Sequence, residues 1–239
     1  MITLNSDAAS TSLSKTTKAI LNEYGIKLNK NLGQNYLIDR NKRDQIIQFG
    51  NLTKDDVVLE IGPGIGTLTI ELAKRVKKVI AIEQDSNICQ ILENRLKKEN
   101  IDNVELINDD ALNVEFPKFD KIISNLPYQI SSPITFKFLN YDFQLAILMY
   151  QKEFASRMNG KVGSKDYSRL SAMLYFKCDV DLLTGVSAES FIPKPKVDST
   201  VVRLTPKLPE LNGQLKHLNI NEINEKDFKT YSKFVKALF

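Results

Sequence analysis

The sequence contains only one histidine, His217, and two cysteines, Cys89 and Cys178. A single histidine in a polar stretch argues against histidine-based acid–base catalysis and against a histidine-rich metal site. Neither cysteine has a partner at the spacing of a metal or redox motif. We therefore expect no bound metal and two buried free thiols, which suits a reducing cytoplasm.

Long apolar runs are also missing. No run reaches the ~18 residues that a membrane-spanning helix requires. Residues 1–18 are rich in serine and threonine, and they lack the apolar block of a secretory signal and the arginines of a transit peptide. We expect a cytoplasmic protein that does not contact membranes, and we interpret residues 1–24 as a flexible N-terminal leader.

The overall composition is that of a globular protein. Of the 239 residues, 42% are hydrophobic and 26% are charged, which is enough to bury a sizeable core. The formal net charge of +4 at pH 7 permits binding to nucleic acid but does not establish it. The length predicts one large domain with room for a small second one.

Short β-rich runs alternate with helical stretches along most of the chain. This alternation predicts parallel strands joined by right-handed crossovers, and the strongly apolar strands predict a sheet covered by helices on both faces. The expected strands are 57–61, 79–83, 104–107, 121–124 and 143–150, with later strands 180–186 and 200–204 as an antiparallel edge. The expected helices are 16–24, 41–50, 67–75, 86–98, 133–139 and 168–177.

These patterns divide the chain into three parts. Residues 25–205 are predicted to form an α/β domain with a mostly parallel sheet after the leader. Residues 206–225 are rich in proline, asparagine and lysine, and a new amphipathic helix begins at Asp227 and is still in progress at Phe239. We therefore interpret residues 206–239 as a linker and the beginning of a small helical C-terminal domain that is truncated here.

A glycine-rich turn, Gly62 to Gly66, joins the first strand to a helix. Glycines at this point allow a tight turn and a close approach of the backbone to a ligand. Glu83 ends the next strand and suits two ribose hydroxyls, while Asp110 follows the third strand and suits an adenine amine. No Gly-Lys-Ser/Thr follows the turn, which argues against ATP hydrolysis. S-adenosylmethionine (SAM) fits this site best, and a turn kept for packing is the alternative.

The tetrad Asn125-Leu126-Pro127-Tyr128 follows the apolar run 121–124. It offers the amide oxygen of Asn125, a free backbone carbonyl at Leu126 or Pro127, and the ring face of Tyr128. These groups can hold an exocyclic amine on a flat heterocycle and position it for attack on a methyl donor. The alternative is a turn with a buried structural tyrosine.

Six segments resemble the small-subunit rRNA adenine-N6 dimethyltransferase family, the KsgA-type enzymes. They are LGQNYL at 32–37, LEIGPGIGTLT at 59–69, NLPYQISSP at 125–133, QKE at 151–153, YSRLS at 167–171 and FIPKPKVDS at 191–199. The glycine turn is shared by many SAM-dependent enzymes, whereas the other long segments in this order are specific. The residues that follow Tyr128 look more like the archaeal and eukaryotic branch than the bacterial one.

The resemblance implies a Rossmann-like SAM-dependent methyltransferase fold and an activity. The implied reaction is the N6-dimethylation of adenosines in a loop near the 3′ end of small-subunit rRNA during ribosome biogenesis. SAM is the implied cofactor and S-adenosylhomocysteine the implied product. The implied partner is the rRNA of an immature small ribosomal subunit, and we expect the chain to act as a monomer.

The resemblance also implies roles for residues at matching positions. The implied cofactor contacts are Asn35, Leu37, Gly62, Gly64, Gly66, Glu83, Asp110 and Asn125. The implied contacts of the target adenine are Asn125, Leu126, Pro127, Tyr128 and Phe191. Phe191 would form a second stacking wall, although packing in the core is an equal alternative. Lys194, Lys196 and Arg169 are expected to contact RNA phosphates, and in the family a helical C-terminal domain completes the RNA-binding cleft.

Three other functions stay open on the sequence alone. The first is methylation of large-subunit rRNA by an enzyme of the macrolide-resistance type, which has similar motifs. The second is a ribosome-assembly or transcription factor that keeps the fold without turnover. The third is a DNA adenine methyltransferase, which little beyond the tetrad supports.

Overall fold

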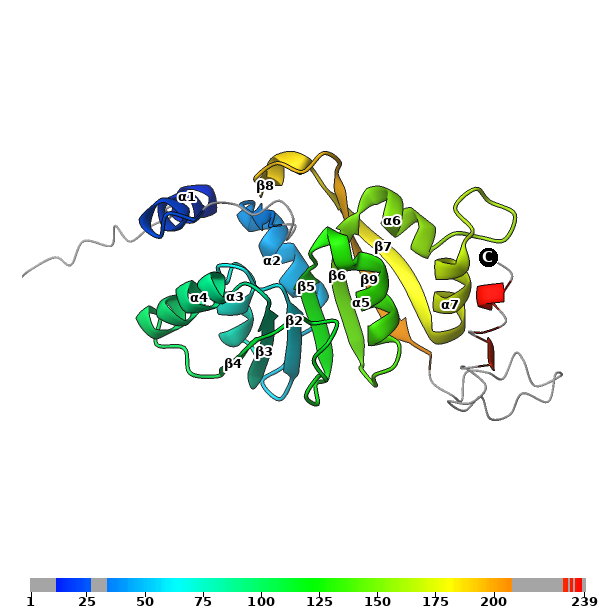
Figure 1. The fold of residues 1–239 in the computed structure, drawn as a ribbon, viewed down its shortest axis with the longest axis horizontal. Helices are drawn as coiled ribbons and strands as arrows, with labels where there is room; N and C mark the ends of the chain where they lie inside the picture. The colour runs from blue at the N-terminus through cyan, green and yellow to red at the C-terminus, as the bar shows by residue number, and fades with distance from the viewer. Residues whose placement is uncertain (1–11, 27–33, 208–229, 232, 234, 238–239) are drawn as a thin grey trace, which may run out of the picture.

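The computed structural model describes residues 12–26, 34–207, 230–231, 233 and 235–237 (Figure 1). Three of the predictions above fall partly on other residues. These are residues 1–11 of the leader, residues 32–33 of the segment 32–37, and most of residues 206–239. Those parts of the predictions lie outside the described residues.

A seven-stranded sheet forms the centre of the described protein, in the order β4-β3-β2-β5-β6-β9-β7 (Figure 1). The first five of these strands run parallel to one another. The strands are β2 Val57–Ile61, β3 Lys78–Glu83, β4 Val104–Asn108, β5 Lys121–Asn125, β6 Leu145–Gln151, β7 Cys178–Val186 and β9 Ser199–Pro206. The prediction of a mostly parallel sheet is therefore confirmed.

The two late strands form the antiparallel edge of the sheet that was predicted, and the structure adds their order. β9 runs antiparallel between β6 and β7, so that β7 is the edge strand. Val201, Val202 and Leu204 of β9 are fully buried, as an interior position requires. The order of strands along a sheet is a long-range property, which the local pattern of β9 does not contain.

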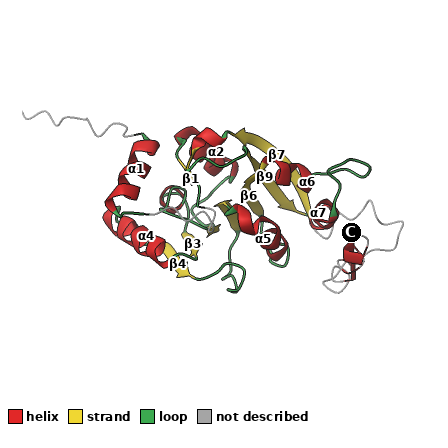
Figure 2. Cartoon of the chain, turned by 45° about the horizontal axis from the view of Figure 1, so that its top comes forward, coloured by secondary structure: helices red, strands yellow, loops and turns green. Residues whose placement is uncertain are grey.

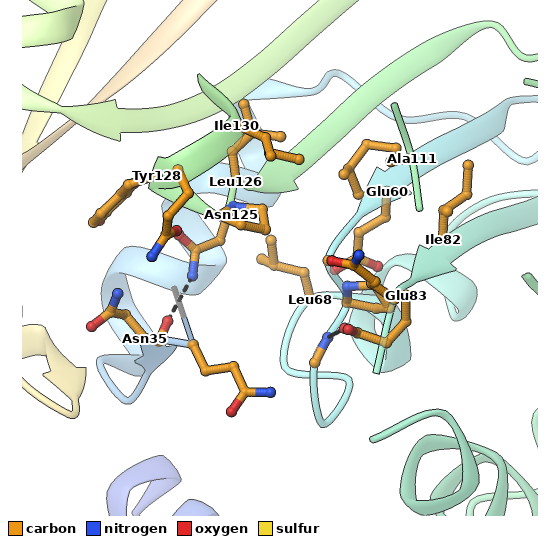
Figure 3. Close-up of a pocket in the computed structure, with 18 of the residues that line it drawn as sticks. Asn35, Glu60, Leu68, Ile82, Glu83, Ala111, Asn125, Leu126, Tyr128 and Ile130 are labelled. Atoms are coloured by element: carbon orange, nitrogen blue, oxygen red, sulfur yellow. Dashed lines mark hydrogen bonds between the residues drawn. The ribbon is translucent and has the colours of Figure 1, made fainter. Parts of the chain in front are cut away.

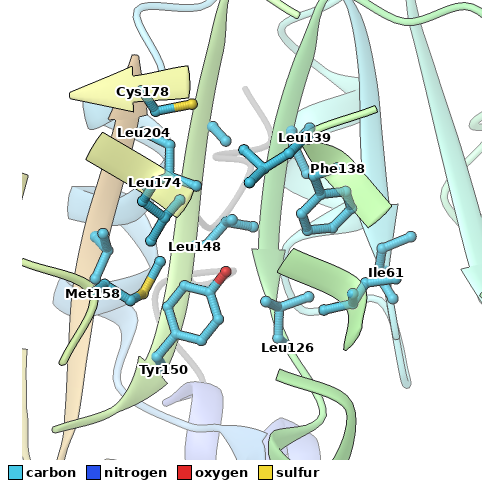
Figure 4. Packing of buried hydrophobic residues seen from close by; sticks show 14 of the residues in the cluster. Ile61, Leu126, Phe138, Leu139, Leu148, Tyr150, Met158, Leu174, Cys178 and Leu204 are labelled. Atoms are coloured by element: carbon cyan, nitrogen blue, oxygen red, sulfur yellow. The ribbon is translucent and has the colours of Figure 1, made fainter. Parts of the chain in front are cut away.

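Helices cover both faces of the sheet, as predicted. Neighbouring residues of a strand point to opposite faces, so Val58 packs with one set of helices and Leu59 with the other. Figure 4 shows the cluster on the Leu59 side, where Phe138 and Leu174 lie beside the strands. The helices are α1 Leu13–Glu23, α2 Arg40–Phe49, α3 Thr69–Ala73, α4 Ser86–Lys98, α5 Ser131–Phe138, α6 Lys152–Met158 and α7 Arg169–Lys177. None of the helices in the described part of the chain is both long and apolar enough to cross a membrane.

Helix α1 shortens the part of the chain that can be a flexible leader. Its residues Ile20 and Leu21 are buried in a cluster with Ile65 and Ile88, and α1 lies beside α4 (Figure 2). The Ser12 hydroxyl caps the first turn by accepting from the Lys15 N–H. The second half of residues 1–24 therefore packs on the domain that was predicted to begin at residue 25.

A two-stranded sheet joins two segments that are distant in the sequence. β1, Tyr36–Leu37, pairs antiparallel with β8, Phe191–Ile192. Two residues are too few to show a period of two, so the sequence did not reveal either strand. The pairing brings the segment 34–37 next to the segment 191–196 at the carboxyl end of the parallel strands.

Candidate functional site

A cavity of about 270 Å³ opens at the carboxyl ends of the parallel strands (Figure 3). Figure 3 shows Glu60 and Glu83 on one side of it and Asn125 and Tyr128 on the other. Its lining includes most of the predicted site residues: Asn35, Leu37, Gly62, Gly64, Glu83, Asp110, Asn125, Leu126, Pro127 and Tyr128. The structure therefore brings these residues together, while their roles in binding and catalysis stay predictions.

The glycine turn forms the floor of this cavity, and none of its three glycines can be replaced without strain. Gly62 and Gly64 have φ angles of +67° and +55°, which residues with side chains rarely adopt. A Cβ atom at Gly62 would lie 3.0 Å from the ring of Pro127, and one at Gly64 would lie 2.9 Å from the ring of Tyr36. Gly66 does not line the cavity; a Cβ there would clash with Leu92, so its role in this structure is packing.

Glu83 lies at the end of β3 with its carboxylate oriented by backbone groups. One oxygen accepts a hydrogen bond from the Gly64 N–H at 3.1 Å, and the other accepts from the Asp85 N–H at 3.0 Å. Asp85 also caps helix α4 by accepting from the Asn87 N–H. Burial raises the pKa of Glu83 above its usual range. This acidic group is thus tied to the glycine turn and has little freedom to move.

Glu60 is a cavity residue that the sequence analysis did not single out. It lies next to the last residue of β2 and is only 2% exposed. Its Oε2 atom is buried without a hydrogen-bond partner among the described residues. The sequence does contain a signal that could have identified Glu60, because an acidic residue is unusual within an apolar strand. A buried carboxyl with one unpartnered oxygen at the cavity wall is suited to receive a cationic group of a ligand.

The protonation of Glu60 leads to a prediction about stability. Burial raises the pKa of Glu60 from 4.5 to about 8, so the folded protein keeps a proton that the unfolded chain releases. The free energy of unfolding should therefore fall as the pH rises from about 5 to about 8, by up to about 1.4 kcal/mol per pH unit. Urea unfolding of the ligand-free protein at several pH values measures this fall.

The matched variant for this prediction is Glu60→Gln. Glutamine has the same shape and stays neutral at every pH, so its unfolding free energy should change less with pH than that of the wild type over the same range. If both proteins show the same pH dependence, Glu60 does not carry the proton.

One side of the cavity is formed by the segment after β4, which contains Asp110 and Ala111. Lys137 of helix α5 holds this segment. Its Nζ donates to the carbonyls of Ala111 at 2.8 Å and Leu112 at 3.2 Å, and also to the carbonyl of Val114. Desolvation by burial lowers the pKa of Lys137. A single ammonium group thus anchors a segment that has no strand or helix of its own.

Lys137→Met should weaken SAM binding about threefold to tenfold, since methionine fills similar space but donates no hydrogen bond to the segment. Titration calorimetry measures this change. Lys118→Met is the matched control, because Lys118 is exposed on the same segment and does not line the cavity. Equal affinity in Lys137→Met and the wild type would contradict the anchoring role.

The tetrad forms the wall opposite Glu83. The Asn125 Nδ2 group donates to the Asn35 carbonyl at 3.1 Å, which orients the amide (Figure 3). The Pro127 carbonyl accepts from the Ile130 N–H at 3.2 Å, which favours Leu126 as the residue with the free carbonyl. Leu126 as a whole is only 2% exposed, and the role of its carbonyl as an acceptor stays a prediction.

A second cavity of about 480 Å³ lies on the outer side of Tyr128. It shares Gln34, Asn35, Tyr128 and Gln129 with the first cavity, and its other lining residues are Gln151, Pro193, Lys194, Pro195 and Lys196. The two predicted phosphate-binding lysines therefore lie at a hollow that borders the tetrad. Lys194 forms an ion pair with Glu189.

Like Gly66, two other predicted residues line neither cavity. Phe191 is 2% exposed and packs with Leu37 and Val201, which matches the core-packing alternative and not a stacking wall in this conformation. Its pairing in β8 directs it into the core, an orientation that the sequence could not reveal. Arg169 begins α7, where its guanidinium lies 5.1 Å from the centre of the Phe136 ring. It lines neither cavity, so its RNA contact stays a prediction.

Sequence comparison identifies relatives along most of the chain. A model of the ribosomal RNA adenine dimethylase family matches residues 25–239. Two archaeal proteins, each called a probable ribosomal RNA small subunit methyltransferase A, are 54% and 53% identical to this chain. They come from Methanosphaera stadtmanae and Methanothermobacter thermautotrophicus, and the alignments cover 80% of this chain and 70% and 68% of the relatives.

Solved structures show the same likeness. A dimethyladenosine transferase from Plasmodium falciparum superposes with a TM-score of 0.70 and 41% identity, over 75% of this chain and 66% of that one. The 23S rRNA methyltransferase ErmE superposes with a TM-score of 0.68 and 30% identity, over 84% of this chain and 77% of that one. The fold is therefore the Rossmann-like methyltransferase fold that the resemblance implied. From the match over residues 25–239 and the archaeal relatives, the chain belongs to the ribosomal RNA adenine dimethylase family.

Proposed function

We propose that the protein dimethylates the N6 amine of adenosines in small-subunit rRNA, with SAM as the methyl donor. One observation carries the proposal: the glycine turn and the tetrad line one cavity and touch each other, since a Cβ at Gly62 would reach the Pro127 ring. A donor site and a site for an exocyclic amine therefore share a wall. Membership of the rRNA adenine dimethylase family supports the same reaction.

The residues of the first cavity suit SAM. Glu83 offers two carboxylate oxygens to ribose hydroxyls, Asp110 offers an acceptor to the adenine amine, and the buried Glu60 faces the cationic amino-acid end. Gly62 and Gly64 line the cavity, where a turn without side chains lets a ligand approach the backbone closely. When bound, SAM supplies a methyl group that its sulfonium makes electrophilic.

The tetrad would make the target amine reactive mainly by holding it. The adenine amine is a weak nucleophile because its lone pair is delocalised into the ring. The Asn125 amide oxygen and the Leu126 carbonyl, as two acceptors for its hydrogens, favour a pyramidal nitrogen whose lone pair is directed at the methyl group. The methylated amine can release its proton to water, so the site needs no strong base.

Tyr128 and the second cavity would receive the base and its backbone. A base that leaves its stack costs a few kcal/mol, and stacking on an aromatic side chain returns about 1–3 kcal/mol. An adenosine in an RNA loop is already partly unstacked, which lowers the cost. Lys194 and Lys196 lie at the edge of this cavity, where they can meet phosphates.

The finer features of the function are part of the same proposal. The target is a loop near the 3′ end of the small-subunit rRNA within an immature subunit, and the enzyme acts as a monomer in the cytoplasm. The main competitor is methylation of large-subunit rRNA, which the structural likeness to ErmE favours. The higher identity to the archaeal small-subunit relatives supports the small subunit instead.

The test is SAM-dependent labelling of ribosomal subunits. Undermethylated small subunits, mature small subunits and large subunits are each incubated with labelled SAM, and their nucleosides are then analysed. Label in N6,N6-dimethyladenosine from undermethylated small subunits alone is the expected result. Label in large subunits would support the competitor, and no label despite measurable SAM binding would support a factor without turnover.

A further inference from the structure

The side chain of Tyr128 is joined to strand β9 by a hydrogen bond between two hydroxyl groups. Its Oη atom lies 2.5 Å from the Oγ atom of Ser199, the first residue of β9. Tyr128 and Ser199 are distant in the sequence, and Ser199 is only 1% exposed. The outer end of the tyrosine ring is therefore held by a buried group of the central sheet.

The Ser199 hydroxyl has a defined position because strands on both sides hold its backbone. Ser199 is the register partner of Gln151 on β6 and of Val186 on β7. The preceding residue, Asp198, accepts a hydrogen bond from the Ala188 N–H through its carboxylate at 2.9 Å. A three-stranded part of the sheet, rather than a loop, thus presents the hydroxyl to the tyrosine.

Tyr128 has few other restraints in the described part of the protein. It opens a 3₁₀ helix of three residues, Tyr128–Ile130, which has no side-chain cap hydrogen bond. It also belongs to none of the four hydrophobic clusters. Tyr128 is partly buried, and its hydroxyl is held by Ser199. The bond to Ser199 is therefore a specific polar contact that favours one orientation of the ring.

We propose that Ser199 is a positioning residue for methyl transfer, whose hydroxyl holds the Tyr128 ring as the stacking wall for the target adenine. This inference rests on the proposed function, because it takes an adenine base as the partner of the ring. It also gives a role to the end of the segment 191–199, to which the family resemblance assigned none. The segment would supply both the lysines of the second cavity and the anchor of its tyrosine wall.

The protein contains a matched pair of hydroxyl groups away from both cavities. The Tyr150 Oη atom lies 2.8 Å from the Thr135 Oγ1 atom, and both residues are fully buried. Neither residue lines the first or the second cavity. Tyr150→Phe therefore reports what the loss of such a bond does to stability alone.

The experiment compares Tyr128→Phe, Ser199→Ala, their double variant and Tyr150→Phe in the full chain. Turnover is measured on undermethylated small subunits at saturating SAM, SAM affinity by calorimetry, and Tm by thermal unfolding. Stacking is measured by the quenching of 2-aminopurine, placed at the methylated position of an rRNA hairpin once nucleoside mapping has located it.

Each single variant should lower kcat about threefold to tenfold, equivalent to about 0.6–1.4 kcal/mol, and should weaken the quenching. SAM affinity should stay at the wild-type value. The double variant should have the same kcat and the same quenching as the less active single variant, because both substitutions remove the same hydrogen bond. Tyr150→Phe should lower Tm and leave kcat and quenching unchanged.

The proposal is overturned if Ser199→Ala lowers only Tm, or if the two single losses multiply in the double variant. If Ser199→Ala does not fold, Tyr128→Phe provides the test. Wild-type turnover and quenching in Tyr128→Phe would reject the positioning role, whereas larger losses of turnover and quenching than in Tyr150→Phe would support it. A wild-type protein that methylates no adenosine refutes the proposed function, and the positioning role, which rests on that function, is rejected with it; loss of turnover in the variants alone concerns the positioning role.

Discussion

Asn125→Ala should lower the rate of methyl transfer at least about 100-fold, a much larger effect than its loss of SAM affinity. The amide oxygen of Asn125 is proposed to accept from the target amine as charge develops on its nitrogen. Groups that stabilise such charge in an enclosed site are worth about 100-fold to 1000-fold in rate. Single-turnover kinetics on undermethylated small subunits, with calorimetry for SAM, separate the two effects.

Asn103→Ala is the matched control for this variant. Asn103 also uses its Nδ2 group to bond backbone carbonyls, those of Ala73 and Val76, but it lies outside the cavity. Asn103→Ala should lower Tm and leave the rate of methyl transfer unchanged. If Asn125→Ala methylates at the wild-type rate, the amide does not hold the target and the proposed mechanism fails.

Glu83→Ala should weaken SAM binding about 100-fold. The substitution removes two charge-assisted hydrogen bonds to the ribose, each worth about 1.5–3 kcal/mol, and alanine cannot replace them. In the wild type the Gly64 and Asp85 N–H groups donate hydrogen bonds to this carboxylate, and the substitution leaves both groups without that acceptor. Calorimetric titration with SAM, and with S-adenosylhomocysteine as the product, measures the loss.

Glu105→Ala controls for the removal of a carboxylate at the surface. Glu105 lies on β4, where it pairs with Lys78 at 2.6 Å, and it does not line the cavity. Its loss should leave SAM affinity unchanged, because exposed ion pairs contribute little. An affinity in Glu83→Ala close to that of Glu105→Ala would show that the ribose is held elsewhere.

These two predictions concern opposite walls of one cavity, and the structure explains why the walls depend on each other. The absence of a side chain at Gly62 is what allows the Pro127 ring to pack against the turn, with 3.0 Å from a hypothetical Cβ to the Pro127 Cγ. The Asn35 carbonyl orients the Asn125 amide, and Asn35 lines both cavities. A change in the turn should therefore disturb the tetrad as well as the cofactor.

Much of the fold follows from local patterns in the sequence. The strand predicted at 57–61 and the helix predicted at 86–98 coincide with β2 and α4, because runs of β-branched residues and an aspartate cap are local signals. The predicted strands at 79–83 and 121–124 are each one residue shorter than β3 and β5. The glycine turn and the acidic strand ends also indicated the edge of the sheet at which a nucleoside would bind.

The remaining features required contacts between distant segments. The pairing of β1 with β8 buries Phe191. From the motif alone, the role of Phe191 could have been either packing in the core or stacking on the base. Burial in the finished cavity wall, rather than its place in a motif, distinguishes Glu60 from other acidic residues. Ser199 reaches Tyr128 only because β9 lies between β6 and β7.

The sequence by itself determined the alternation of strands and helices, the glycine turn, the tetrad and the family to which they belong. These are local properties, set by hydrophobic period, backbone preference and the order of motifs. Only the tertiary structure decided which side chains face the cavities, which carboxyl is buried with an unpartnered oxygen, and which hydroxyl holds the tyrosine. Those properties depend on strand order and register, where one position of difference moves a side chain from one face of the sheet to the other.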